Sequence, residues 1–220
     1  MTWQQLLSMI AEGTWETIYM TLFSTLFAYI LGLPLGVLLV VTEKGHIMEN
    51  QPFNSILGTV INILRSVPFL ILMITVIPLT RFVMGTTIGS TATIMPLVIA
   101  AFPYVARTVE SSLKEVDRGV IEAAQSMGAS KFQIICKVIL PEALPSLINS
   151  AAIATTTILS YSAMSGAIGG GGLGALAINY GYYRYKTDVL LVSVVMLVVL
   201  VQVIQMIGTY LARSLDHRLK

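Results

Sequence analysis

Five long apolar runs, separated by short charged or glycine-rich segments, dominate the 220-residue sequence. The first run has no charged side chain between Glu16 and Glu43, and a helix needs only about 20 apolar residues to cross the hydrocarbon core of a bilayer. Charged residues make up 11% of the chain, against about 25% in soluble domains, which excludes a water-soluble fold. We therefore predict a single-domain, all-α polytopic membrane protein with five spans, at residues 17–42, 54–80, 87–106, 145–168 and 189–212.

The second run is the least regular, because Arg65 interrupts it and Pro68 follows. Two arrangements are open: one helix crosses the membrane whole with Arg65 near its cytoplasmic end, or a surface turn precedes a shorter span. Arg65 could support a cytoplasmic interface, line an inner vestibule or extend its charge to the lipid surface.

The basic residues predict the orientation, because cytoplasmic segments of membrane proteins are enriched in Lys and Arg. With the N-terminus outside, three basic residues lie outside, Arg81, Arg184 and Lys186. Ten then lie on the cytoplasmic side: Lys44, Arg65, Arg107, Lys114, Arg118, Lys131, Lys137, Arg213, Arg218 and Lys220. We predict an N-out, C-in topology. Because Lys44 is the first basic residue, we expect no cleavable signal peptide.

The segment at residues 107–142, between the third and fourth predicted spans, holds ten of the chain's 24 charged residues. Two short helices are expected there. The first has apolar residues at helical spacing, and Gly128 stands where a left-handed stop belongs; these residues are Val120, Ile121, Ala124 and Met127.

Ser130 and Gln133 form a capping box that opens the second of these helices. Pro141 is expected to end it. Its predicted apolar face comprises Phe132, Ile135, Cys136 and Ile139. Helices this short are unstable alone, so their apolar stripes must be buried. They could pack against the membrane domain or against a second protein in the cytoplasm.

The same segment resembles the EAA loop of ABC-importer permeases. The resemblance rests on Glu122, Ala123 and Ala124, then Gly128, then Leu140 and Pro141, with Val138 as the one conservative departure. In that family the loop forms coupling helices that seat in a cleft of an ATP-binding subunit. The resemblance therefore implies coupling roles for Glu122, Ala123, Ala124, Met127, Gly128, Leu140 and Pro141.

Further motifs along the chain resemble methionine-importer permeases, a family of compact five-span proteins. They lie at residues 15–17, 32–37, 65–69, 140–145 and 161–164. The resemblance implies a homodimer in the bacterial inner membrane, two ATP-binding subunits that hold ATP and Mg²⁺, and an external substrate-binding protein. It implies no cofactor in this chain.

The ionisable residues agree with an external source of energy. Proton-driven carriers place Asp, Glu or His within their spans, and the predicted spans of this chain contain none. No nucleophile and base pair can be assembled there, which disfavours an intramembrane enzyme. The formal charge of +2 is too small for nucleic-acid binding, and the one cysteine, Cys136, offers neither a disulfide nor a metal site.

The fourth span and the glycine run after it are the candidate translocation path. Tyr161 and Ser162 are candidate pathway residues, because their hydroxyls could line a water-filled path or form hydrogen bonds between helices. Met164 is the candidate gate residue, because a flexible thioether could close a narrow path. Gly169, Gly171 and Gly174 match the spacing of a dinucleotide fingerprint. We reject that interpretation because no strand precedes them, and we expect an irregular, closely packed backbone instead.

Three alternatives are open at this point. The chain could be a permease for another small amino acid or osmolyte. It could be a structural subunit of a membrane complex, or an intramembrane enzyme that needs no ATPase partner.

Overall fold

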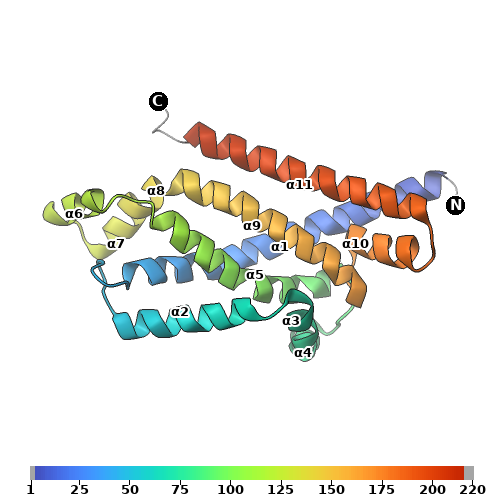
Figure 1. The fold of residues 1–220 in the computed structure, drawn as a ribbon, viewed down its shortest axis with the longest axis horizontal. Coiled ribbons are helices and arrows are strands. Elements are labelled where there is room, and N and C mark those ends of the chain that lie inside the picture. The colour runs from blue at the N-terminus through green and yellow to red at the C-terminus, as the bar shows by residue number, and fades with distance from the viewer. Residues whose placement is uncertain (1–2, 216–220) are drawn as a thin grey trace. The chain divides into compact units, whose positions relative to one another are not determined.

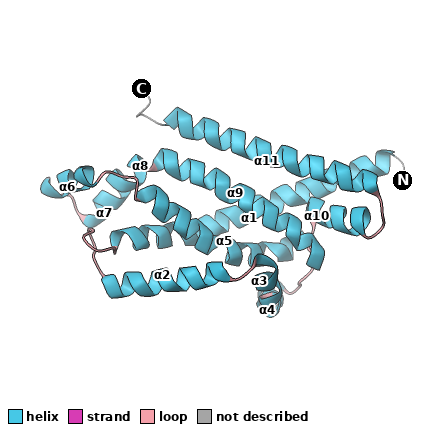
Figure 2. Cartoon of the chain, viewed as in Figure 1, coloured by secondary structure: helices cyan, strands magenta, loops and turns pink. Residues whose placement is uncertain are grey.

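The computed structural model describes residues 3–215, and every regular element in that range is a helix (Figures 1 and 2). The longer elements are α1 (Trp3–Val41), α2 (Gln51–Ser66), α5 (Ser90–Leu113), α9 (Leu144–Ser165) and α11 (Thr187–Leu215). The short helices are α3 (Phe69–Thr75), α4 (Ile77–Met84), α6 (Arg118–Ser126), α7 (Lys131–Ile134), α8 (Leu140–Glu142) and α10 (Gly172–Leu176). Three turns of other pitch complete the set: the π-helices η1 (Ile135–Ile139) and η3 (Ala177–Tyr182), and the 3₁₀-helix η2 (Gly166–Ile168).

The all-helical membrane class predicted from the sequence agrees with this structure. Four helical stretches within residues 3–215 are long and apolar enough to cross a membrane, at 3–41, 90–113, 144–182 and 187–215. A fifth is obtained if α2 and α3 are counted as one broken span.

The predicted second span is not one continuous helix. α2 ends at Ser66 and α3 begins at Phe69, with Pro68 as its N-cap. Proline has no N–H to donate and disfavours helical geometry in the residue before it, here Val67. The arrangement with one unbroken helix is therefore wrong.

The first helix begins at Trp3, 14 residues before the start of the predicted first span at Thr17. Leu6 and Ile10 in this added part are buried in one apolar cluster with Leu173 and Val189. Tertiary packing, rather than membrane insertion, explains why the helix extends through the segment that contains Glu12 and Glu16.

The chain folds into two compact units, each assembled from three separate stretches of sequence. Of the described residues, the first comprises 3–28, 67–101 and 155–205, and the second comprises 29–66, 102–154 and 206–215. Helices α1, α5, α9 and α11 each contribute residues to both units.

Close helix packing builds the second unit. Gly32 and Gly36 of α1 lie directly against α5: a Cβ atom on Gly36 would be 2.7 Å from the carbonyl oxygen of Ala106 and 2.6 Å from Val109 Cγ1. Only glycine permits such an approach of two backbones. Beside this contact, Leu39, Ile61 and Ala106 form a buried apolar cluster.

Candidate functional site

Helix α6, which carries the EAA-like residues, has a defined beginning and end. Asp117 is its N-cap and accepts a hydrogen bond from the Gly119 N–H at 2.6 Å. At the other end Gly128 has a φ of +80°. The N–H of Gly128 donates to the Gln125 carbonyl and the N–H of Ala129 donates to the Ala124 carbonyl, which is the Schellman pattern. The predicted glycine stop is confirmed.

The capping box at the start of α7 is also confirmed. The Ser130 hydroxyl accepts from the Gln133 N–H, and the Gln133 side chain accepts from the Ser130 N–H at 2.8 Å. Pro141, however, does not end the helix, and that prediction is wrong. In η1 the N–H of Leu140 donates to the carbonyl of Ile135 five residues earlier. This wider turn brings the chain into α8 with Pro141 in its first turn, where a missing N–H is tolerated.

The predicted apolar face of the second short helix is confirmed for Ile139 but is wrong for Phe132 and Cys136, for the same reason. Ile134 and Ile139 are the buried residues, whereas Phe132 and Cys136 are exposed. In a π-helix, residues five apart share a face, and the two buried isoleucines have this spacing. The sequence pattern assumed the ordinary helical spacing of three and four residues.

Burial divides the predicted coupling residues into an inner and an outer set. Ala124, like Ile121 beside it, is buried, which anchors α6 to the rest of the chain. The outer set is exposed and comprises Glu122, Ala123, Met127, Gly128 and Pro141, with Leu140 half-buried.

Large apolar side chains occur on the exposed side of this segment. Met127 is 81% exposed, Phe132 is 75% exposed and Val120 is 43% exposed. We call the exposed side of residues 118–142 the coupling surface, after the role that the resemblance to the EAA loop predicts for it. The structure thus anchors two capped, short helices by one face and leaves apolar groups on the other.

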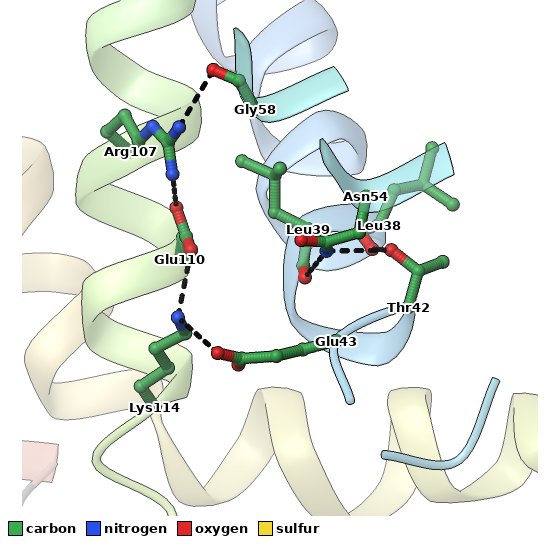
Figure 3. Close-up of polar contacts among 9 residues, drawn as sticks. All are labelled: Leu38, Leu39, Thr42, Glu43, Asn54, Gly58, Arg107, Glu110 and Lys114. Atoms are coloured by element: carbon green, nitrogen blue, oxygen red, sulfur yellow. Dashed lines mark hydrogen bonds and ion pairs between the residues drawn. The ribbon is translucent and has the colours of Figure 1, made fainter. Parts of the chain in front are cut away.

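A network of charged side chains, which the sequence analysis did not single out, lies just before α6 (Figure 3). Arg107 Nη1 lies 2.6 Å from Glu110 Oε2, and Lys114 Nζ lies 3.0 Å from Glu110 Oε1. Lys114 also pairs with Glu43 at 3.2 Å, and Arg107 Nη2 donates to the Gly58 carbonyl at 2.9 Å. The spacing of three and four residues along α5 is the sequence signal that could have found it.

These pairs explain why α5 continues seven residues past its predicted end at Ala106. The carboxylate of Glu110 is largely buried, with 12% of the side chain exposed, and is compensated by the cations of Arg107 and Lys114. Burial lowers the pKa of Lys114, but its hydrogen bonds to Glu110 and Glu43 outweigh that effect and raise the pKa above its ordinary value.

His46, in the loop after α1, lies in the same electrostatic environment. Burial, followed by the positive charges of Arg118 and Lys114, lowers the pKa of His46 despite the opposing charge of Glu43. Its Nδ1 accepts a hydrogen bond from the Ile47 N–H at 3.0 Å, which also favours the neutral ring.

The candidate pathway residues do not converge on one point in the first unit. Tyr161 is stacked on Phe69 with ring centroids 4.4 Å apart. Ser162 is buried and its hydroxyl donates to the Leu159 carbonyl of its own helix at 2.7 Å, whereas Met164 is exposed. Their pathway roles stay predictions.

The glycine run after α9 has the irregular, closely packed backbone expected of it. Gly169 and Gly172 have positive φ values of 91° and 79°, and a Cβ on Gly174 would collide with the backbone of Ala163. The segment is held from α1: the Glu16 carboxylate accepts from the Gly172 N–H at 2.6 Å, and the Thr17 hydroxyl accepts from the Leu173 N–H at 2.9 Å.

Arg65, whose role was open, is exposed near the end of α2 with its guanidinium 6.0 Å from the centre of the Tyr104 ring. Within residues 3–215 no group of three His, Cys, Asp or Glu side chains is arranged to hold a metal ion.

Known proteins resemble this chain over most of its length. Residues 32–220 match the family described as "Binding-protein-dependent transport system inner membrane component". The probable D-methionine transport system permease protein MetI of Vibrio cholerae is 54% identical over 210 residues, which cover 96% of this chain and 93% of that protein. The methionine import system permease protein MetP of Bacillus subtilis is 45% identical over 212 residues and covers 96% of each chain. A solved structure of the MetNI methionine ABC transporter in an inward-facing conformation matches with a TM-score of 0.96 and 44% identity, over 99% of this chain and 100% of that one.

Proposed function

Since the chain belongs to the family of binding-protein-dependent transport system inner membrane components, we propose that it is the membrane subunit of an ATP-driven methionine importer. The relatives from Vibrio cholerae and Bacillus subtilis, both named for methionine transport, support this choice of substrate over another small amino acid or an osmolyte.

The coupling surface is the observation that carries the proposal. A membrane subunit without its own nucleotide site needs a rigid element through which a partner can move it. The Schellman end of α6 and the capping box of α7 supply rigidity. Met127 and Phe132 supply exposed apolar area, and such area on a segment with many charged neighbours is typical of a protein interface.

The proposed assembly has two copies of this chain, two ATP-binding subunits and one external substrate-binding protein. ATP and Mg²⁺ belong to the ATP-binding subunits, which dock on the coupling surfaces. The likeness to a solved structure of the MetNI methionine ABC transporter supports this arrangement.

The proposed topology has five spans, with α2 and α3 together as the second, the N-terminus outside and the C-terminus inside the bacterial inner membrane. The ten-to-three distribution of basic residues supports it. In this orientation residues 107–142, including α6 to α8, face the cytoplasm. Tyr161, Ser162 and Met164 are proposed to line or gate the path between the two copies.

Transport by the purified complex tests the proposed function. The chain is co-expressed and purified with its ATP-binding subunit, reconstituted in vesicles with the external binding protein and assayed for uptake of labelled methionine, with other amino acids as competitors. We expect uptake only with hydrolysable ATP. Uptake of a different amino acid or an osmolyte would overturn the substrate assignment, and a chain active without an ATPase would be an enzyme or another class of carrier.

One substitution separates a transport subunit from a merely structural one. Met127→Asp places a carboxylate on the coupling surface without touching the packed face of α6, and we expect uptake to be lost. Met48→Asp changes the same residue type at an exposed position outside that surface, with 40% of the side chain accessible, and is the matched control. Normal uptake by Met127→Asp would contradict the docking role.

A further inference from the structure

The charged network before α6 joins three helices of the second unit at one place (Figure 3). Arg107 has two bonds from one guanidinium, to the carboxylate of Glu110 on its own helix and to the Gly58 carbonyl of α2. Lys114 likewise has two partners, Glu110 on α5 and Glu43 in the turn just after α1. Arg107, Glu110, Lys114 and Glu43 sum to zero charge, so the network is internally compensated.

A second bond pair fixes the end of α1 to α2 beside the network. The last four carbonyls of a helix lack partners within it, and Leu39 belongs to this group in α1. The Asn54 side chain of α2 donates to the Leu39 carbonyl at 2.6 Å and to the Thr42 hydroxyl at 3.0 Å. The C-terminal end of α1 and the beginning of α2 are thereby joined to each other, and the network joins both helices to α5.

The network is also connected directly to α6. Lys114 is the first residue after α5, and Asp117, the N-cap of α6, follows three residues later. Backbone hydrogen bonds hold the turn between them: Glu115 N–H to Ser112 and Val116 N–H to Leu113. Val116 is buried. A displacement of α6 therefore reaches Lys114 through a short, hydrogen-bonded turn rather than a flexible linker.

We propose that Arg107, Glu110 and Lys114 are positioning residues for coupling: they make α1, α2 and α5 follow α6 when the ATP-binding partner moves it. This rests on the proposed function. Without the network, α6 moves while α1 and α2 lag, so that ATP is hydrolysed with less transport.

Arg107 is the residue whose geometry the proposal needs most. Its guanidinium donates to a carboxylate and a backbone carbonyl at once, in a fixed fork that a lysine cannot reproduce. Arg107→Lys keeps the charge and removes the bridge. If charge alone were required, that variant would be fully coupled.

The test measures methionine imported per ATP hydrolysed by the reconstituted complex. Wild type is compared with Arg107→Lys, Arg107→Met, Lys114→Met and Glu43→Gln. Lys44→Met is the matched control, because it removes a cation next to Glu43 at a position with no bond in the network. We expect the ratio to fall about 2- to 30-fold in the network variants, while ATP hydrolysis persists and Lys44→Met retains the wild-type ratio.

Each outcome bears on one proposal. If the wild-type complex shows no ATP-driven uptake, the proposed function fails. If the wild type transports and the network variants keep its ratio, the positioning role fails. Should Arg107→Met not assemble, Lys114→Met and Glu43→Gln decide, because both residues are about two-fifths exposed and tolerate substitution. Because the two residues act through one ion pair, the double variant Lys114→Met, Glu43→Gln should import as much methionine per ATP hydrolysed as Lys114→Met alone.

Discussion

At position 128 the backbone conformation itself selects the residue. Gly128 has a φ of +80°, and nothing lies within 4 Å of the point where a Cβ would be. The requirement is therefore conformational and not steric. Gly45 has a φ of +76° and equally open surroundings. Both positions therefore require a residue that tolerates a positive φ, but they lie in different parts of the chain.

Gly128→Ala and Gly45→Ala form a matched pair because of this likeness. Each places an L-residue in the left-handed region, which costs roughly 1–2 kcal/mol of local stability. We expect a similar drop in thermal unfolding midpoint for both in detergent, but weaker binding of the ATP-binding partner for Gly128→Ala alone. Equal partner binding by the two variants would show that the α6 to α7 angle does not matter for docking.

His46 gives a prediction about pH. Its pKa in the folded chain lies below the ordinary value of 6.5, so the unfolded chain binds a proton first as the pH falls. The free energy of unfolding therefore decreases below about pH 6.5 and recovers above it. We expect His46→Gln to flatten the change in unfolding midpoint between pH 7.5 and 5.5, with His217→Gln, the other histidine, as control. An unchanged pH profile in His46→Gln would contradict the lowered pKa.

At the scale of elements, local chemistry sets some helix boundaries and tertiary packing sets others. Ser130 and Gln133 open α7 by bonds between neighbours in sequence, whereas the end of α1 depends on Asn54, 15 residues away from Leu39. The first kind of boundary is fixed by the local sequence. The second depends on which helices meet.

Ser130→Ala removes the cap of α7 and should cost about 1 kcal/mol. We expect faster amide hydrogen exchange at residues 131–135, measured by mass spectrometry. Ser126→Ala is the control, because the Ser126 hydroxyl donates back to the Glu122 carbonyl within α6, a bond that adds little stability. Loss of protection in the control but not in Ser130→Ala would contradict the capping box.

Gly36→Ala tests the contact of α1 with α5. The added Cβ would lie under 3 Å from the Ala106 carbonyl and from Val109, so the helices must separate, and overpacking of this kind costs about 1–3 kcal/mol. We expect a lower unfolding midpoint and less folded protein in the membrane. Leu31→Phe, a larger change on an exposed side of the same helix, should leave both unchanged; a midpoint unaltered by Gly36→Ala would refute the close packing.

These elements also show what could be predicted from the sequence. The glycine stop at 128 and the capping box at Ser130 were predicted, because both depend on residues within a few positions of each other. The exposed position of Phe132 was not, because η1 changes the helical spacing. The early start of α1 was not either, because it depends on Leu6 and Ile10 packing against residues from α10 and α11.

At the scale of the molecule, the proposal places the coupling surface in the cytoplasm and the Tyr182 to Tyr185 loop outside. The chain has one cysteine, Cys136, and it is exposed within α6 to α8. In right-side-out vesicles we expect a membrane-impermeant maleimide to leave Cys136 unmodified but to label a cysteine introduced at Tyr185, 89% exposed, in a Cys136→Ser background. The reverse pattern would invert the topology.

The reactivity of Cys136 in the assembled complex tests the central claim most directly. Cys136 lies one helical turn after Phe132 on the coupling surface, and its thiol is accessible in this chain. With inside-out vesicles we predict ready maleimide labelling of the chain alone and protection when the ATP-binding subunit is bound. Labelling at the same rate in a complex that hydrolyses ATP and imports methionine would contradict the account.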